Sequence, residues 1–167
     1  MYKKIALILF VLTLSISVFA QEEKKSKKMA DKKAVLAVVD DLFANMAAHK
    51  PDAIVALHTP EAQLVGLVKG RDGKSRIQTF KAEQFSKNFA VKRAELKELM
   101  YDHKIDIHDD LALVSGRYVF FVGGKISHCG VNAFQLVRTE KGWLIGGAAS
   151  TMDRTGCTEK EKAMKAE

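Results

Sequence analysis

Four consecutive runs of strand-forming residues in the second half of the chain restrict the fold more than any other feature. The runs lie near 95–107, 111–122, 126–138 and 143–152. The segments between them are His108-Asp109-Asp110, Gly123-Gly124-Lys125 and Glu140-Lys141-Gly142. Because short segments of turn-forming residues connect antiparallel neighbours, the sequence predicts a meander of four strands.

Helical patterns precede these strands. Asp31 can serve as the N-cap of a first helix, which should stop by Lys50 because Pro51 disfavours helical conformation in the residue before it. The apolar residues of this helix recur at the spacing of one face, and they are Val35, Val38, Val39, Leu42, Phe43 and Met46. Pro51 is suited to opening a second helix that runs to about Leu57.

The segment between the second helix and the meander predicts one strand and one helix. Residues 62–68 have the composition of a short strand, and 69–74 that of a loop. Thr79 can cap a third helix that has Phe85 and Phe89 on one face with Ala82. Helices followed by a run of strands indicate an α+β domain with the helices on one side of a curved sheet.

Both faces of the central strands are largely apolar. In 111–122 and 126–138 apolar side chains occupy odd and even positions alike, whereas a sheet with one wet face alternates apolar with polar residues. The helices can cover one face, and a second copy of the chain is the economical cover for the other. The sequence therefore predicts a homodimer, with a monomer shielded by small residues and loops as the alternative.

The first 20 residues have the pattern of a secretory signal. Lys3 and Lys4 precede an apolar run, and Val18 and Ala20 occupy the −3 and −1 positions of a cleavage site before Gln21. A membrane anchor is disfavoured because the run is shorter than the roughly 20 residues that a spanning helix needs. We therefore expect a periplasmic or secreted protein, cleaved after Ala20, with no membrane association after cleavage.

The net charge of +7 is unevenly distributed. The signal segment contributes +2 and residues 21–33 contribute +3, while 158–167 is neutral, so the body 34–157 carries only +2. A phosphate-binding face is therefore not supported, and no nucleic-acid partner is expected. We interpret 21–31 as a Lys-rich leader, 32–157 as the folded domain and 158–167 as a charged tail.

The chain has two cysteines, Cys129 and Cys157. In an oxidising compartment a pair of cysteines favours a disulfide over a metal or catalytic site, with two free thiols as the alternative. His128 and Cys129 cannot form a catalytic dyad, because consecutive side chains of a strand point to opposite faces. The histidines match no closed ligand pattern, so neither a metal nor any other cofactor is expected.

Several segments resemble the nuclear transport factor 2-like superfamily. The resemblance covers about 32–157 and is carried by 112–120, by Gly124 to Leu136 with its Ser-His-Cys-Gly sequence, by Gly142-Trp143-Leu144-Ile145, and by Thr151 before Cys157. It is closest to exported bacterial members described as lumazine-binding or of unknown function; polyketide cyclase-like and ketosteroid isomerase-like proteins are further relatives. The resemblance implies a cone-shaped sheet around three helices, a pocket between them and frequent dimerisation. It does not transfer an activity.

The candidate site residues follow from residue type and register. His58, Asp102, His128 and Asp153 are candidates for acid–base chemistry, although none lies in a motif that assigns a role. If 139–143 closes the last hairpin, residues whose numbers sum to about 282 face each other, which places Asp153 near Cys129 and Arg154 near His128.

Aromatic surface combined with a few polar atoms is typical of a small-molecule pocket. Together, Tyr118, Asn132, Phe134 and Trp143 have this character. The favoured function is therefore the binding of a small apolar or amphipathic molecule. An isomerase, dehydratase or cyclase that uses a pocket His or Asp is the first alternative, and a protein-interaction or assembly module is the second. A buried acid–base pair beside a cavity would favour the enzyme.

Overall fold

The structure is a computed structural model in which the chain divides into two compact units, Met1–Ala34 and Val35–Glu167. It describes the backbone of residues 2–70, 72–91 and 94–166, and the side chains of the same residues apart from 2–21 and 24. The second unit contains the whole sheet, and the site described below lies within it.

The first unit is helical throughout its described backbone. Residues 2–34 belong to α1 (Tyr2–Ala47), so the prediction that Asp31 caps this helix is wrong. Residues 21–34 contain neither Gly nor Pro and are rich in Lys, Glu and Ala, so the helix continues through them. The predicted signal peptide depends on side chains of 1–20 that lie outside the described ones. Among the described residues, no helix has both the length and the apolar character needed to cross a membrane.

The remaining helices are short. They are α2 (Pro51–Ala56), α3 (Ala82–Ser86), which continues into the 3-10 helix η1 (Lys87–Phe89), and α4 (Glu159–Lys162). Pro51 lies in the first turn of α2, as predicted. The predicted cap at Thr79 is wrong, because Thr79 lies in a strand and α3 begins after Lys81, whose N–H donates to Gln84 Oε1 over 3.1 Å. β-Branched residues favour the strand at 77 and 79.

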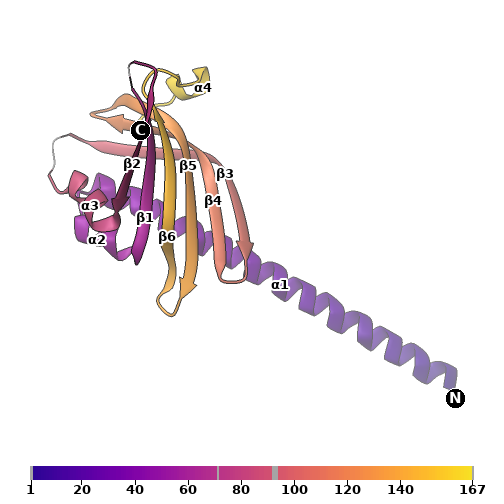
Figure 1. The fold of residues 1–167 in the computed structure, drawn as a ribbon. Coiled ribbons are helices and arrows are strands. Elements are labelled where there is room, and N and C mark those ends of the chain that lie inside the picture. Colours follow the sequence, from indigo (N-terminus) through magenta and orange to yellow (C-terminus); the bar gives the residue numbers. More distant parts are fainter. Residues whose placement is uncertain (1, 71, 92–93, 167) are drawn as a thin grey trace. The chain divides into compact units, whose positions relative to one another are not determined.

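Six strands form one curved sheet (Figure 1). They are β1 (His58–Lys69), β2 (Ser75–Lys81), β3 (Leu96–His108), β4 (Leu111–Val122), β5 (Lys125–Thr139) and β6 (Gly142–Asp153). Their order is β2-β1-β6-β5-β4-β3, in which β1 pairs parallel to β6 and all other pairs are antiparallel. The predicted meander is confirmed as β3–β6, and the strand predicted at 62–68 is the regular part of the longer β1.

The register of the last hairpin agrees with the prediction. Cys129 pairs with Asp153 and Asn132 with Ser150, so the residue numbers of both pairs sum to 282. Arg154 follows at the next position and is close enough to His128 for its charge to affect the imidazole. The strand ends of β5 and β6 therefore bring the predicted residues together.

The main core lies between the inner face of the sheet and the helices. Its members on α1 are Val35, Val39, Leu42 and Met46, which confirms the predicted helix face. Ile54 of α2 and Phe89 of η1 join them, and the sheet contributes Ala112, Val114, Phe134, Leu136, Trp143 and Ile145. Figure 1 shows α2 and α3 beside the β1–β2 end of the sheet.

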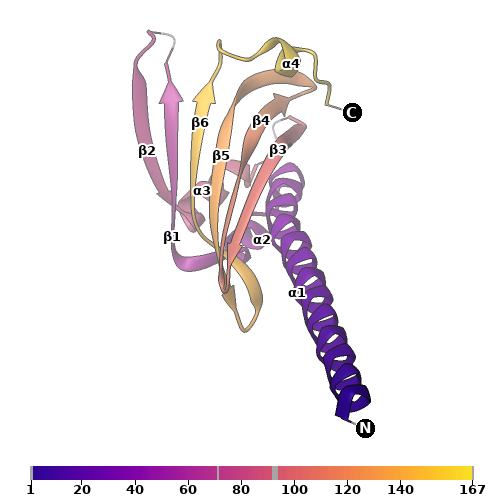
Figure 2. The same ribbon diagram turned by 90° about the vertical axis from the view of Figure 1, so that its right-hand side faces the viewer.

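A second cluster lies on the outer face of the sheet, and the C-terminal segment covers it. Val119, Phe121 and Cys129 of this face pack against Cys157, Met164 and Ala166. Figures 1 and 2 both show α4 at the end of the sheet opposite the β5–β6 turn. The segment predicted as a charged tail therefore packs against the sheet and is part of the fold.

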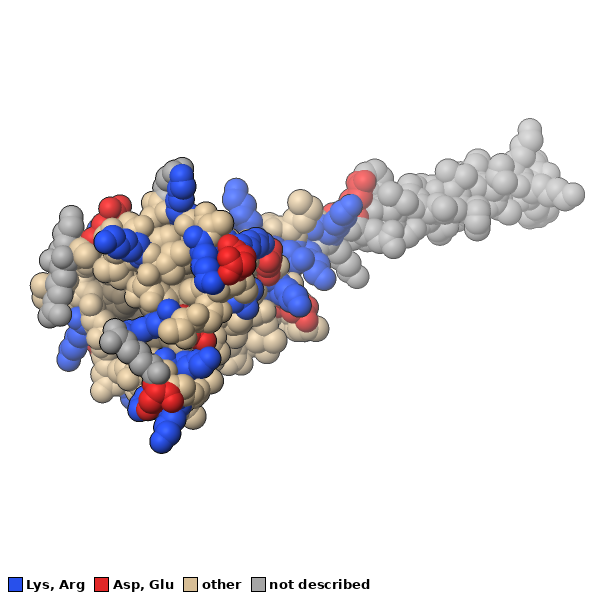
Figure 3. Space-filling model, turned by 90° about the horizontal axis from the view of Figure 1, so that it is seen from above, with Lys and Arg blue, Asp and Glu red and all other residues tan. Residues whose placement is uncertain are grey.

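Lys, Arg, Asp and Glu side chains are interspersed on the face of the molecule shown in Figure 3.

Candidate functional site

The inner face of the sheet borders a cavity of about 610 Å³. Leu42, Phe43 and Met46 of α1 form part of its wall, and Phe85 and Phe89 form another part. Residues from all six strands complete it, with an apolar majority. Its volume is within the range of roughly 300–1,000 Å³ typical of small-molecule sites.

A carboxyl group, Glu98, lies in this apolar wall. Asn132 Nδ2 donates a hydrogen bond to Glu98 Oε1 over 2.6 Å, and Ser150 Oγ donates to Asn132 Oδ1 over 2.7 Å. These three side chains come from β3, β5 and β6 and all line the cavity. The chain of hydrogen bonds fixes the orientation of the Asn132 amide and holds one Glu98 oxygen in place.

Burial changes the acidity of Glu98. Removal from bulk water disfavours the carboxylate and raises the pKa of Glu98 from 4.5 to about 7, although the hydrogen bond from Asn132 acts in the opposite direction. The carboxyl group therefore exists in both protonation states near neutral pH. A titratable group with this property beside a cavity is a candidate for acid–base chemistry or for ligand recognition.

His128 also lines the cavity, and it is neutral there. Its ring stacks on Phe120 with centroids 4.9 Å apart and meets Tyr118 edge-on at 5.6 Å. Burial, and then the charge of Arg154, lower the pKa of His128 to about 4. Its Nδ1 lies 3.2 Å from Ser127 Oγ. At neutral pH this imidazole can therefore exchange hydrogen bonds with a ligand without carrying a charge.

Tyr118 is a further polar residue of the cavity wall. Its hydroxyl donates a hydrogen bond to Thr151 O over 2.9 Å, and only 2% of the residue is exposed. Burial, followed by the neighbouring Glu98 charge, raises the pKa of Tyr118. The phenol is therefore uncharged and contributes an aromatic ring to the cavity wall.

The structure brings three of the four predicted pocket residues to this cavity. Tyr118, Asn132 and Phe134 line it, and Trp143 does not. Trp143 lies in the main core, with the Arg138 guanidinium 4.3 Å from its ring centroid. Trp143 pairs with Arg138 at the turn end of the β5–β6 hairpin, and its side chain there belongs to the main core and not to the cavity wall.

The other predicted acid–base candidates do not line the cavity. His58 is buried, with Nδ1 2.7 Å from Ile54 O, and burial lowers its pKa. Asp102 forms an ion pair with Lys160 on the surface. Asp153 accepts hydrogen bonds from Thr155 N and Gly156 N, which lower its pKa. These three residues therefore have structural environments, and His128 is the predicted candidate that reaches the cavity.

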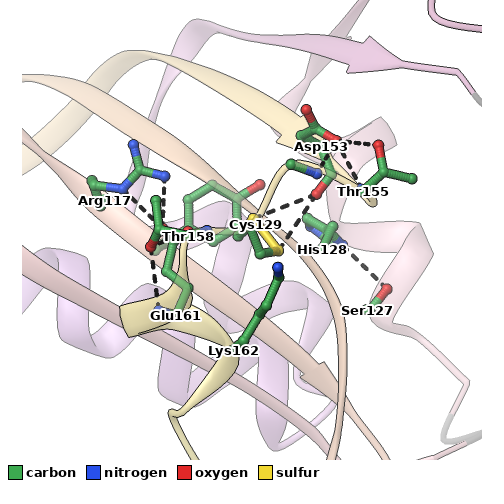
Figure 4. The surroundings of a disulfide bond; sticks show 12 residues. Arg117, Ser127, His128, Cys129, Asp153, Thr155, Thr158, Glu161 and Lys162 are labelled. Carbon is green, nitrogen blue, oxygen red and sulfur yellow. Dashed lines mark hydrogen bonds and ion pairs between the residues drawn. A yellow bond between two sulfur atoms is a disulfide. The ribbon is translucent and has the colours of Figure 1, made fainter.

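Cys129 points away from the cavity, as the alternation of β5 predicts, and forms a disulfide with Cys157 (Figure 4). Their Cα atoms are 5.6 Å apart. This bond fastens the C-terminal segment to the outer face of the sheet. The carboxyl of Glu161 lies within 4.8 Å of both sulfur atoms, but sulfurs joined in a disulfide are not thiolate metal ligands.

Glu161 is fully buried in this outer cluster. Arg117 Nε and Tyr101 Oη each donate to its Oε1 over 2.8 Å, and Thr158 N donates to Oε2 over 2.7 Å. Burial alone would raise the pKa of Glu161, but the hydrogen bonds from Thr158, Tyr101 and Arg117 outweigh it and lower the pKa. The charge is thus paired on both oxygens and stabilises the docked C-terminal segment.

Sequence reasoning missed Glu98, although a signal for it exists. Leu96, Glu98 and Met100 share one face of β3, and Leu96 and Met100 pack against the main core. A carboxylate between two inward-facing apolar residues of a strand occupies a core position, which is costly unless it has a partner or a role. The alternation of β3 therefore groups Glu98 with Leu96 and Met100, but which face of β3 is covered follows only from the packing of the helices.

No protein-family model and no curated protein sequence matches the chain. Solved structures do match it in fold. A nuclear transport factor 2-like protein with a cystatin-like fold from Novosphingobium aromaticivorans is 11% identical, with a TM-score of 0.63 over 83% of this chain and 91% of that chain.

Two further solved structures agree with this match. A nuclear transport factor 2-like protein of unknown function from Shewanella baltica is 14% identical, with a TM-score of 0.56 over 75% of this chain and 95% of that chain. A protein of unknown function with a cystatin-like fold from Nostoc punctiforme is 11% identical, with a TM-score of 0.59 over 74% and 92%. Together with the curved sheet and the helices on its inner face, these matches show that the chain has the fold of the nuclear transport factor 2-like superfamily.

Proposed function

We propose that this protein binds a small amphipathic molecule in the cavity on the inner face of the sheet. The observation that carries the proposal is the combination of a mainly apolar cavity of about 610 Å³ with one fixed polar cluster, Glu98, Asn132 and Ser150. Apolar walls supply affinity, and a few convergent polar groups fix the orientation of the ligand. A ligand with an apolar body and a polar end matches both parts.

Native mass spectrometry of unreduced protein, purified from the compartment where it accumulates, tests this proposal. Ala148 lines the cavity and the neighbouring Ala149 is exposed, so Ala148→Phe fills the cavity while Ala149→Phe is its matched control. We expect a retained small molecule in the native protein and in Ala149→Phe, and none in Ala148→Phe. Equal retention by the two variants would place the ligand elsewhere and contradict the proposal.

An acid–base enzyme is the second candidate function, and the acidity of Glu98 favours it. A carboxyl with a pKa of about 7 can accept or donate a proton at neutral pH, which is the property of an efficient general base or acid. Incubating the retained molecule with the protein in D₂O distinguishes the candidates. Carbon-bound deuterium that the native protein introduces and Glu98→Gln does not would indicate an enzyme, and its absence in both would leave a binding protein.

Export is part of the proposed function. The basic and apolar pattern of the first 20 residues supports cleavage after Ala20, and the Cys129–Cys157 disulfide is of the kind that persists in oxidising compartments. The intact mass of the protein from the periplasm or medium tests this. A mature chain that begins at Gln21 is expected, and a full-length cytoplasmic chain would contradict export.

The homodimer stays a prediction. The C-terminal segment covers part of the outer face, while Leu67, Leu111, Leu113 and Val131 remain between 37% and 49% exposed there. Sedimentation analysis of the unreduced protein tests whether a second copy covers these side chains. A dimer that Leu113→Asp dissociates is expected, and a monomer at all accessible concentrations would contradict it.

A further inference from the structure

The charge balance of the cavity wall is unusual. Among the described lining residues, Glu98 is the one acidic side chain and Arg154 the one basic side chain. Arg154 is exposed, and its charge acts on His128, whereas the acidity of Glu98 is governed by burial and by the Asn132 amide. The Glu98 carboxyl is thus set into the wall with a neutral amide, rather than a cation, as its hydrogen-bond partner.

Glu98 is half-buried in a mainly apolar wall, where a carboxylate needs either a counter-ion or a proton. In the empty protein the proton is available, since burial favours the neutral acid. A ligand that enters the cavity excludes water from the one Glu98 oxygen that Asn132 does not hold. The ligand itself must then supply the compensating positive charge or leave the acid protonated.

Apart from the exposed Arg154, the wall around Glu98 suits a cation better than an anion. The aromatic rings of Phe43, Phe120, Phe134 and Tyr118 border the same cavity. Aromatic faces carry a negative electrostatic potential and attract ammonium groups. An anionic end placed beside Glu98 would instead meet a like charge or require both groups to share a proton.

We propose that the ligand carries an organic cation, such as a protonated amine, at one end of an apolar body, and that Glu98 is its counter-ion. This inference rests on the proposed binding function and names the chemical class of the ligand. Asn132 acts as a positioning residue, because its amide orients the carboxyl toward the cavity. The apolar body lies against the phenylalanine side chains.

The proposal predicts a definite pH dependence of affinity. A cation binds the ionised form of Glu98, so affinity rises with pH until the carboxyl is fully ionised and is then constant. With a pKa of about 7, affinity should increase about tenfold between pH 6 and pH 8. His128 and Tyr118, which line the same cavity, do not titrate in this range, because the pKa of His128 is about 4 and that of Tyr118 is raised above its ordinary value.

Calorimetry with three probes of the same apolar body tests the proposal: phenylbutylamine, phenylbutanol and phenylbutyrate. At pH 8 the amine should bind at least tenfold more tightly than the alcohol, and phenylbutyrate should bind most weakly. Glu98→Gln should remove the preference for the amine and change alcohol affinity less than twofold. Glu95→Gln, which changes an exposed carboxyl near the start of β3, is the matched control and should change nothing.

Each outcome decides one of the two proposals. If the alcohol or phenylbutyrate binds as tightly as the amine, the inference is wrong and the binding function stands. If none of the probes binds at millimolar concentration, the inference fails, and native mass spectrometry of Ala148→Phe and Ala149→Phe decides the binding function. Should Glu98→Gln fail to fold, as judged by near-ultraviolet circular dichroism, the native protein still decides, because an affinity for the amine that is constant between pH 6 and pH 8 would overturn the inference.

Discussion

Asn132 of β5 donates its side-chain amide to the Glu98 carboxyl of β3 over 2.6 Å, across the intervening strand β4. This hydrogen bond links β3 and β5, the two neighbours of β4 in the sheet, at the wall of the cavity. It also leaves the carboxyl with a neutral partner, so that burial dominates its acidity. The predictions below follow from this contact and from the attachment of the C-terminal segment.

Glu98→Gln should change how stability depends on pH. The raised pKa means that the folded protein holds this proton more tightly than the unfolded chain, so the contribution of the protonated acid is fully present below pH 4.5 and is lost as pH rises to about 7. The native protein should therefore lose up to about 3 kcal/mol relative to Glu98→Gln across this range. Urea denaturation at a series of pH values measures it, and parallel stability curves would contradict the burial of the acid.

His128→Gln should have the opposite effect. Because the pKa of folded His128 is lowered to about 4, the neutral imidazole contributes stability that is present above pH 6.5 and is lost as pH falls toward 4. The variant should lack this loss, which amounts to about 3 kcal/mol by pH 4. The same denaturation series checks it, with the exposed His108→Gln as the control. A variant that loses stability in acid as steeply as the native protein would show that His128 is accessible to water.

Glu161→Gln should weaken the docking of the C-terminal segment. The substitution leaves Arg117 without its counter-ion in a part-buried site, which costs about 2 kcal/mol of unfolding free energy. Glu159→Gln removes an exposed ion pair with Lys162 on the same short helix and should cost less than about 0.5 kcal/mol. Equal effects of the two substitutions in chemical denaturation would mean that the segment is not docked as described.

Reduction of the Cys129–Cys157 disulfide should lower stability and release the C-terminal segment. The bond closes a loop with a sequence separation of 28, for which the chain-entropy estimate is about 3 to 4 kcal/mol. Hydrogen exchange of 158–164 should accelerate on adding reductant, while β4 and β5 stay protected. Cys157→Ser should show the fast exchange without reductant and no further response to it. Unchanged exchange in that variant would assign the docking to Glu161 alone.

The strands of the meander were predictable because their signals are local. Alternation and turn residues at 108–110, 123–125 and 140–142 define each hairpin, and the register of the last one follows from its turn. β2 was not predicted, because Ser75–Lys81 is a largely exposed edge strand whose polar residues resemble a loop. Its pairing with β1 is a tertiary contact that composition does not encode.

The site was predictable only in part for a related reason. Tyr118, Asn132 and Phe134 were chosen because aromatic and polar side chains are typical of a pocket, and all three reach the cavity. Trp143 was chosen for the same reason, but it lies at the turn end of its hairpin and does not reach the cavity. Glu98 was overlooked because carboxylates are common on exposed strand faces. Its role depends on which face of β3 is covered, and that is decided by the helices of the first half of the chain.

The most direct test of this account is the titration of the Glu98 side-chain carboxyl by carbon-13 nuclear magnetic resonance, with the signal assigned by comparison with Glu98→Gln. The account predicts a midpoint near pH 7, since the group is buried at the cavity with Asn132 as its partner. A midpoint near 4.5, together with the surface glutamates, would contradict it. In that case the carboxyl would be in contact with bulk water, and neither ligand recognition nor proton transfer could be assigned to it.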